Sequence, residues 1–141
     1  MPEAIYTAEA TSSGGGRNGH VRSSDGIIDL EVKQPPALGG PGGATNPEQL
    51  FAAGWASCFL SALKMGAAQQ EVALTDSTVA VEVSLAKGDD GGLGLSADFT
   101  VTIAGVSQAD AEDLTAAAHE VCPYSVATRG NIPVAFTTVI A

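Results

Sequence analysis

Basic residues are scarce in this chain: lysine and arginine together number 6 of 141 residues, against 16 aspartates and glutamates. The formal net charge at neutral pH is therefore −10. Nucleic acids and anionic membranes bind proteins through clusters of cationic side chains, which neutralise phosphates. Because the sequence has no basic stripe, we expect neither of them as a partner.

Long apolar runs are also missing. The longest one covers Leu50–Leu63 and stops at Lys64, so it is shorter than the roughly 20 residues that a membrane span needs. Residues 1–16 lack the basic head and apolar run of a signal peptide. The sequence therefore predicts a cytoplasmic protein that does not enter a membrane.

Cysteine occurs only twice, as Cys58 and Cys122. A chain of this length can bury a core without disulfides or metal ions, so we expect one domain over residues 1–141. In a reducing compartment, two cysteines seldom serve as a structural staple. A bridge between them is more often transient and catalytic.

The pattern of apolar and turn residues predicts an α+β fold. Strict alternation of apolar residues in "TVAVEVSL" and "LSADFTVTI" predicts an antiparallel hairpin. A second helix should begin after Ser107 and end before Pro123. The strands are expected at residues 4–11, 20–23, 27–32, 78–85, 95–103 and 132–140, in the order β-β-β-α-β-β-α-β.

A long helix is expected between the third and fourth strands. Thr45 or Asn46 can cap its N-terminus, and Pro47 suits its first turn. Over residues 50–68, apolar and small side chains occupy nearly every face, which predicts a helix that is buried all round. Cys58 lies near the middle of this helix.

The two cysteines allow three interpretations. An unpaired cysteine is often a small core residue. A metal site would need more ligands, and no zinc spacing is present, so no metal is predicted. In a peroxide-reducing pair, one thiolate attacks the peroxide with the help of a nearby cation, and the other thiol captures the sulfenic acid. The candidate metal ligands are His20, Cys58, His119 and Cys122.

Three segments of the chain resemble the signature blocks of the organic hydroperoxide resistance proteins, which belong to the OsmC-like family. They are "GGRNGHVRSSDG" at 15–26, "TNPEQLFAAGWASCFLSALK" at 45–64 and "HEVCPYSVATRGNI" at 119–132. The blocks occur in the family's order and nearly span the chain. The resemblance implies antiparallel sheets packed around a long buried central helix, in an intertwined homodimer.

The resemblance also implies a thiol-dependent peroxidase with no metal, haem or other bound cofactor, which reduces organic and fatty-acid hydroperoxides to alcohols. Cys58 matches the family's peroxidatic cysteine and Cys122 its resolving cysteine. Arg17 matches the arginine that stabilises the thiolate, and Glu48 the acid that holds this arginine. The family recycles the resulting disulfide with the dihydrolipoyl thiols of lipoylated proteins, as an antioxidant response to oxidative stress.

Four large apolar residues lie around Cys58 on its helix and offer surface that an alkyl tail can bury. Organic hydroperoxides are therefore expected to be better substrates than hydrogen peroxide. The expected substrate-binding residues are Phe51, Trp55, Phe59 and Leu60.

The expected helix separates Glu48 from Cys58 by ten positions, or about 15 Å of helical rise. An arginine held by Glu48 could not easily reach Cys58 of the same chain across that gap. Two such helices packed antiparallel would bring Glu48 of one chain beside Cys58 of the other. The sequence therefore predicts an active site shared across a dimer interface.

The chain departs from the family pattern at three positions. Val126 stands where asparagine is usual, Pro133 where aspartate is common, and Trp55 where tyrosine is common. None of these changes removes a catalytic group. The alternative function is that of a binding protein with the same fold that has lost turnover, but the matches at the four catalytic positions argue against it.

Overall fold

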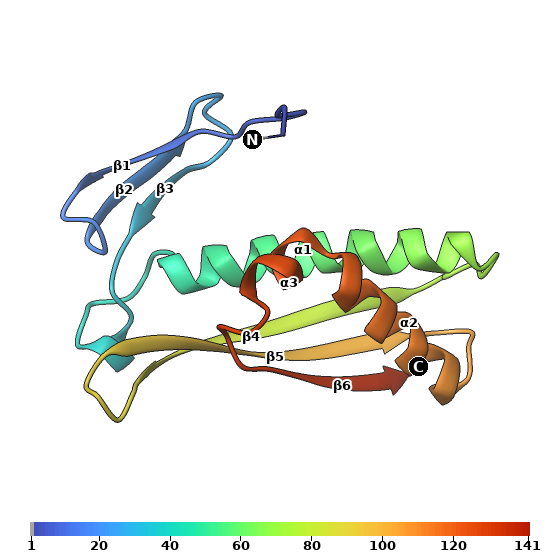
Figure 1. Cartoon of the computed structure of the whole chain (residues 1–141). Helices are drawn as coiled ribbons and strands as arrows, with labels where there is room; N and C mark the ends of the chain where they lie inside the picture. The colour runs from blue at the N-terminus through green and yellow to red at the C-terminus, as the bar shows by residue number, and fades with distance from the viewer. Residues whose placement is uncertain (1) are drawn as a thin grey trace. The chain divides into compact units, whose positions relative to one another are not determined.

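The computed structural model describes residues 2–141, and Figure 1 shows the order of its elements. The chain divides into two compact units, with the boundary between Leu50 and Phe51. We call residues 2–50 the N-terminal unit and residues 51–141 the C-terminal unit. The expectation of one domain over residues 1–141 stays a prediction.

The N-terminal unit is built on a three-stranded antiparallel sheet in the order β1-β2-β3. Because Gly19 has no side chain, β2 can approach β1 closely: a Cβ on Gly19 would lie 2.1 Å from the Ser13 carbonyl oxygen. The strands are β1 (Ala10–Gly14), β2 (Gly19–Ser23) and β3 (Asp29–Val32), and a short 3₁₀ helix, η1 (Pro36–Leu38), follows. The turn between β1 and β2 carries Arg17.

The first strand lies later in the chain than predicted. The sequence pattern placed it at residues 4–11, but β1 begins at Ala10 and ends at Gly14. Alternation of apolar residues cannot show whether a neighbouring strand is available for pairing, and β1 pairs with β2 only over Ala10–Gly14. The predictions for β2 and β3 were close to the observed bounds.

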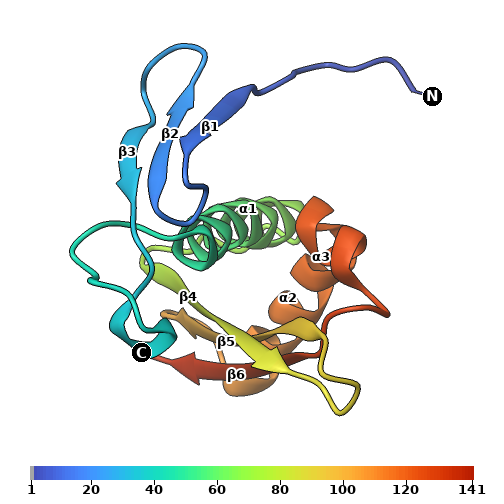
Figure 2. The ribbon, with the colours of Figure 1, turned by 90° about the vertical axis from the view of Figure 1, so that its left-hand side faces the viewer.

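The C-terminal unit packs helices on one face of a second three-stranded sheet, ordered β4-β5-β6 (Figure 2). β4 and β5 form the predicted antiparallel hairpin, whereas β6 runs parallel to β5. The parallel pairing follows from the helical connection. It differs from the antiparallel pairing of the expected sheets, which the other three strand pairs have. The elements are α1 (Pro47–Gln69), β4 (Ser77–Lys87), β5 (Leu93–Ile103), α2 (Gln108–Val121), α3 (Pro123–Thr128) and β6 (Val134–Ile140); α1 begins in the N-terminal unit.

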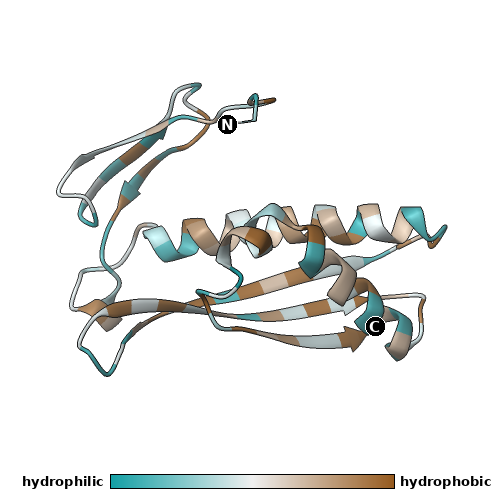
Figure 3. Ribbon diagram, viewed as in Figure 1, coloured by the Kyte–Doolittle hydropathy of each residue, from teal (hydrophilic) through white to brown (hydrophobic). Residues whose placement is uncertain are grey.

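The core of the C-terminal unit lies between α1 and the sheet. Trp55 and Phe59 of α1 are fully buried, and their rings lie 4.9 and 5.0 Å from the ring of Phe99 on β5. Phe136 of β6 continues this cluster, with its ring 4.9 Å from that of Phe99. The strands alternate in hydropathy, as Figure 3 shows, because only alternate side chains face the helices.

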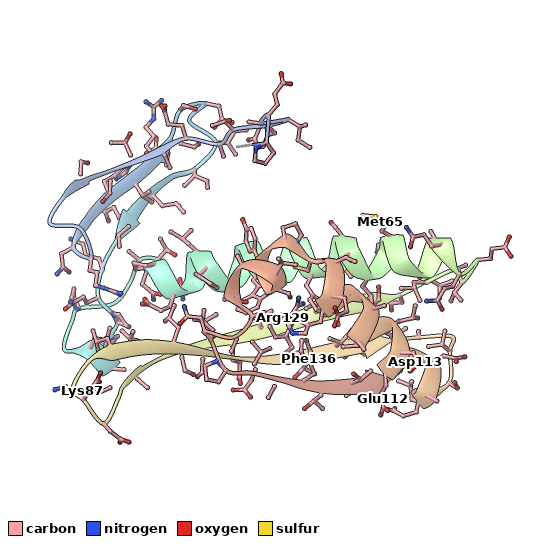
Figure 4. All side chains as sticks on the ribbon, in the orientation of Figure 1. Met65, Lys87, Glu112, Asp113, Arg129 and Phe136 are labelled. Atoms are coloured by element: carbon pink, nitrogen blue, oxygen red, sulfur yellow. The ribbon has the colours of Figure 1, made fainter. Side chains whose placement is uncertain are left out.

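Burial of α1 is one-sided in the single chain, so the prediction of a helix buried all round was wrong for this chain. The buried residues are Trp55, Phe59, Ala62, Leu63 and Ala67. They recur at spacings of three and four, so they form one stripe that faces the sheet. Ser57, Ser61 and Met65 are exposed. The side chain of Met65 leaves α1 on the side away from the sheet (Figure 4).

α1 is longer than the apolar run Leu50–Leu63, which by itself is too short to span a membrane. The helix has 23 residues and a mean hydropathy of 1.3 in its most apolar window. By length and composition α1 could therefore cross a bilayer, a test that the core helices of soluble proteins also pass. In this structure its buried stripe packs on the sheet instead.

The helix boundaries follow the predicted capping residues. The Asn46 side chain accepts a hydrogen bond from the Gln49 N–H at 2.9 Å, and the Ser107 hydroxyl accepts one from the Asp110 N–H at 3.1 Å. α2 ends at Val121, as the following proline required. α3 was not predicted, and it has only six residues.

Candidate active site

The structure brings the two cysteines together within the C-terminal unit. The Sγ atoms of Cys58 and Cys122 lie 3.4 Å apart. Cys58 is half-buried, and Cys122 is fully buried. A disulfide needs a sulfur–sulfur separation of about 2.05 Å, so a small rotation of the two side chains would bring them to bonding distance.

The backbone holds Cys122 from both sides. This residue lies between the two helices, as the C-cap of α2 and the N-cap of α3. Its N–H donates to the Ala118 carbonyl, and its own carbonyl accepts from the Val126 N–H, both at 2.9 Å. Pro123 after it forces the change of direction between the helices. These contacts therefore fix the position of the Cys122 thiol relative to α1.

The surroundings of Cys58 favour its protonated form. Burial raises the pKa of the Cys58 thiol above its ordinary value, and the adjacent Cys122 thiol raises it further. A hydrogen bond from the Tyr124 backbone N–H acts in the opposite direction, because it stabilises the thiolate. Since burial dominates, the thiolate of Cys58 needs a cation beside it to be populated at neutral pH.

Arg17 and Glu48 form a second pair, which lies within the N-terminal unit. The two terminal nitrogens of Arg17 donate to the two carboxylate oxygens of Glu48 at 2.8 and 2.7 Å. This two-point geometry fixes the plane of the guanidinium. The hydrogen bonds from Arg17 lower the pKa of Glu48, and the same contact raises the pKa of Arg17. The ion pair is therefore intact at neutral pH.

An apolar groove of about 620 Å³ runs along α1 from Cys58, between α1 and α2. Its α1 side uses positions at intervals of three, four and seven from Cys58, which share one side of a helix. The groove ends at two glutamines. The lining residues are Cys58, Ser61, Ala62, Met65, Gly66, Gln69, Gln70, Ala117, Val121 and Pro123.

None of the four predicted substrate-binding residues lines this groove. Trp55 and Phe59 are fully buried against Phe99, so they have no surface to offer a substrate in this chain. Phe51 and Leu60 pack against the same core and are partly buried. The prediction chose residues by size and apolarity. Helical spacing alone does not separate the two sets, because Phe51 and Trp55 precede Cys58 by seven and three positions, as Ala62 and Met65 follow it by four and seven.

Two of the candidate metal ligands, Cys58 and Cys122, are in contact. Among residues 2–141 no cluster of three or more His, Cys, Asp and Glu side chains could hold a metal ion. The ring of His119 packs on Phe136 at 4.8 Å, and burial lowers its pKa. His20 pairs with Asp29 on the N-terminal sheet.

Comparisons with known proteins agree with the resemblance in the sequence. The OsmC-like protein family matches residues 40–137. The organic hydroperoxide resistance protein of Xanthomonas axonopodis pv. citri (strain 306) is 45% identical over 137 residues, which cover 96% of this chain and 95% of that protein. The organic hydroperoxide resistance protein OhrB of Bacillus subtilis (strain 168) is 44% identical over 132 residues, which cover 93% and 96%.

Solved structures show the same fold. A crystal structure of an organic hydroperoxide resistance protein from Legionella pneumophila has a TM-score of 0.93 and 48% identity, covering 97% of this chain and 99% of that one. The crystal structure of OhrB from Bacillus subtilis has a TM-score of 0.87 and 43% identity, covering 96% and 99%. The chain therefore belongs to the OsmC-like family, within its group of organic hydroperoxide resistance proteins.

Proposed function

We propose that this protein detoxifies organic hydroperoxides as a thiol-dependent peroxidase. The observation that carries the proposal is the contact between the Cys58 and Cys122 sulfur atoms, 3.4 Å apart at the end of an apolar groove. A half-buried thiol that peroxide can reach stands beside a buried thiol that can capture the product. The names of its relatives support the substrate class.

The chemistry requires two steps at these sulfur atoms. The Cys58 thiolate attacks the terminal oxygen of the hydroperoxide and, with one proton, forms a sulfenic acid and an alcohol. The Cys122 thiol then attacks the Cys58 sulfur, so that a disulfide forms and water leaves. An external dithiol must return two electrons and two protons. We propose dihydrolipoyl thiols of a lipoylated protein for this role, in the cytoplasm.

We propose the groove beside Cys58 as the binding surface for the organic part of the substrate. Its walls are mainly carbon, and each buried methylene contributes about 0.8 kcal/mol to binding. Two or three methylenes would therefore favour an organic hydroperoxide over hydrogen peroxide by more than about tenfold in kcat/KM. Met65, on the wall of this groove, is 57% exposed in the single chain and is accessible to mutation.

The test is peroxide consumption by the purified protein with dihydrolipoamide as the reductant. We expect turnover of cumene hydroperoxide, with kcat/KM more than tenfold above that for hydrogen peroxide. Met65→Lys should lower kcat/KM for cumene hydroperoxide and leave that for hydrogen peroxide nearly unchanged. Leu93→Lys, at an exposed apolar position outside the groove, is the matched control. Binding without any turnover would instead identify a binding protein.

We also propose that the working form is a homodimer. The N-terminal sheet buries only one of its strand residues, Val32, among the described residues. A three-stranded sheet needs a packed face to be stable. Large apolar side chains are exposed on this unit, and we propose that a second copy of the chain covers them. They are Ile5, Tyr6, Ile27, Ile28, Leu30 and Leu38.

Arg17 is proposed as the cation that ionises Cys58, with Glu48 holding its guanidinium. A cation beside a thiolate lowers its pKa by about 1 to 3 units. In Arg17→Ala the Cys58 pKa should therefore rise, and the thiolate fraction at neutral pH should fall by about tenfold or more. The loss should be greatest at low pH and should recover as the pH rises through the new pKa. Titration of the Cys58 thiolate and the pH profile of peroxide consumption measure this effect.

Two further variants make this experiment specific. Arg17→Lys should restore only part of the activity, because an ammonium cannot match the carboxylate at two points. Arg22→Ala removes an arginine from the same unit, one that lies 3.8 Å from Asp29, and serves as the control. Equal thiolate titrations in wild type and Arg17→Ala would remove this role from Arg17.

A further inference from the structure

A buried hydrogen bond connects α1, which carries Cys58, to α3, which begins directly after Cys122. The indole Nε1–H of Trp55 on α1 donates to the Ser125 hydroxyl on α3 at 3.3 Å. Both side chains are fully buried. Water cannot replace either partner there, so loss of the hydroxyl would leave the indole N–H without an acceptor.

This hydrogen bond lies one helical turn from each sulfur atom. Trp55 precedes Cys58 by three positions, and Ser125 follows Cys122 by three positions. The Trp55–Ser125 hydrogen bond and the contact between the sulfur atoms therefore join the same two segments of the chain, one helical turn apart. Any movement of α3 away from α1 that breaks this bond also separates Cys122 from Cys58.

A second contact holds α3 at the same place. Gly54 precedes Trp55 on α1, and a Cβ built on Gly54 would lie 3.3 Å from Cε2 of the Tyr124 ring. The absence of a side chain at Gly54 thus leaves room for Tyr124, which precedes Ser125. A helix of six residues is too short to be stable alone. The position of α3 therefore depends on contacts such as these.

We propose that Trp55 and Ser125 are positioning residues that hold the Cys122 thiol against Cys58, so that the disulfide forms before a second peroxide arrives. The inference rests on the proposed function, because it concerns the resolving step. Neither residue contacts the reacting oxygen. Their contribution is to the rate at which Cys122 captures the sulfenic acid.

The step that competes with capture is over-oxidation. Once the Cys58 sulfenic acid has formed, a second hydroperoxide can oxidise it to a sulfinic acid and is itself reduced to an alcohol. Capture by Cys122 gives the disulfide and water. Only over-oxidation depends on peroxide concentration. The concentration that converts half of the protein to sulfinic acid therefore measures the rate of capture.

The experiment treats the full-length protein with increasing cumene hydroperoxide, without reductant, and quantifies Cys58 sulfinic acid and the Cys58–Cys122 disulfide by mass spectrometry. Ser125→Ala and Trp55→Phe should each lower the half-conversion concentration by about threefold to tenfold, the effect of one lost hydrogen bond. The rate of the first reaction with peroxide should not change. The double variant should resemble the single variants, because both remove the same bond.

The control is Thr115→Val, which removes a buried hydroxyl that donates to the Ala111 carbonyl at 2.8 Å on α2. It should lower the melting temperature without moving the half-conversion concentration. If a core variant does not fold, Gly54→Ala tests the same link, because its methyl group would displace the exposed Tyr124 ring. It should move the half-conversion concentration in the same direction.

The outcomes separate the two proposals. If the wild-type protein forms no Cys58–Cys122 disulfide, the proposed function itself is wrong. If wild type forms the disulfide and the folded variants over-oxidise at the same peroxide concentration as wild type, Trp55 and Ser125 have no positioning role. An equal shift in Thr115→Val would mean that the effect is general destabilisation, which also overturns the inference.

Discussion

Replacing Cys58 by serine should abolish peroxide consumption. A serine hydroxyl is not ionised at neutral pH and cannot be oxidised to an equivalent of sulfenic acid, so no step of the proposed cycle can begin. The assay is loss of cumene hydroperoxide with dihydrolipoamide in excess. The expected rate for Cys58→Ser is that of the reaction without enzyme.

Replacing Cys122 by serine should have a different effect. Peroxide can still reach Cys58, so one equivalent should be consumed quickly as the sulfenic acid forms. Without the neighbouring thiol, the sulfenic acid lasts longer and should oxidise further to sulfinic acid. Mass spectrometry should find two added oxygen atoms on Cys58 in this variant, and a disulfide in the wild type.

The control for both cysteine variants is Ser57→Ala. Ser57 is exposed on α1 and does not line the groove, so this change alters a small polar side chain of the same helix without removing a thiol. Ser57→Ala should keep near wild-type activity. Peroxide turnover that persists in Cys58→Ser would place the chemistry elsewhere. A wild-type protein with no cross-link after one equivalent of peroxide would remove the resolving role of Cys122.

The sequence predicted secondary structure best where the local pattern of apolar residues matches the way the segment packs in the fold. The alternating residues of β4 and β5 can bury one face in only one register, and the structure has this hairpin. Capping residues located the starts of α1 and α2 to within a residue. The placement of β1 failed because strand pairing depends on a partner, which the pattern of one segment does not reveal.

The family blocks predicted Cys58 and Cys122 as a reacting pair, and their roles stay a prediction. The structure shows that the two sulfur atoms are in contact, which the sequence alone could not show. α3 was missed because its sequence, "PYSVAT", contains proline, serine and threonine, which are weak helix formers. The link between Trp55 and Ser125 spans 70 positions, so only the tertiary structure could show it.

The second prediction with a large expected effect concerns the dimer. We expect that each of its two active sites combines residues from both chains. α1 is one continuous helix from Pro47 to Gln69, and it contains both Glu48 and Cys58. Ten positions of helix separate these residues by about 15 Å. Since Arg17 is held by Glu48 of its own chain, we expect that this arginine acts on Cys58 of the partner chain.

Mixed dimers test this arrangement. Cys58→Ser and Glu48→Ala chains, each inactive or impaired as homodimers, are co-expressed with different affinity tags, and the heterodimer is purified with both tags. If sites are shared, one site of the heterodimer combines a native Cys58 from one chain with a native Glu48 from the other. The heterodimer should then regain about half of the wild-type peroxidase activity, since one of two equivalent sites is intact. If each site lies within one chain, no intact site exists and activity should stay at the level of the parents.

A second, reciprocal heterodimer has the opposite expected activity under each arrangement of the sites, so the two measurements together distinguish the arrangements. Here one chain is wild type and the other carries both Cys58→Ser and Glu48→Ala. With shared sites, the native Cys58 faces a chain that lacks Glu48, and the native Glu48 faces a chain that lacks Cys58, so both sites are impaired. With sites inside one chain, the wild-type chain keeps a complete site and about half of the activity. The two heterodimers contain the same substitutions in equal number, so differences in stability or expression cannot produce opposite results. High activity in the reciprocal heterodimer and low activity in the first would therefore show that Glu48 serves Cys58 of its own chain.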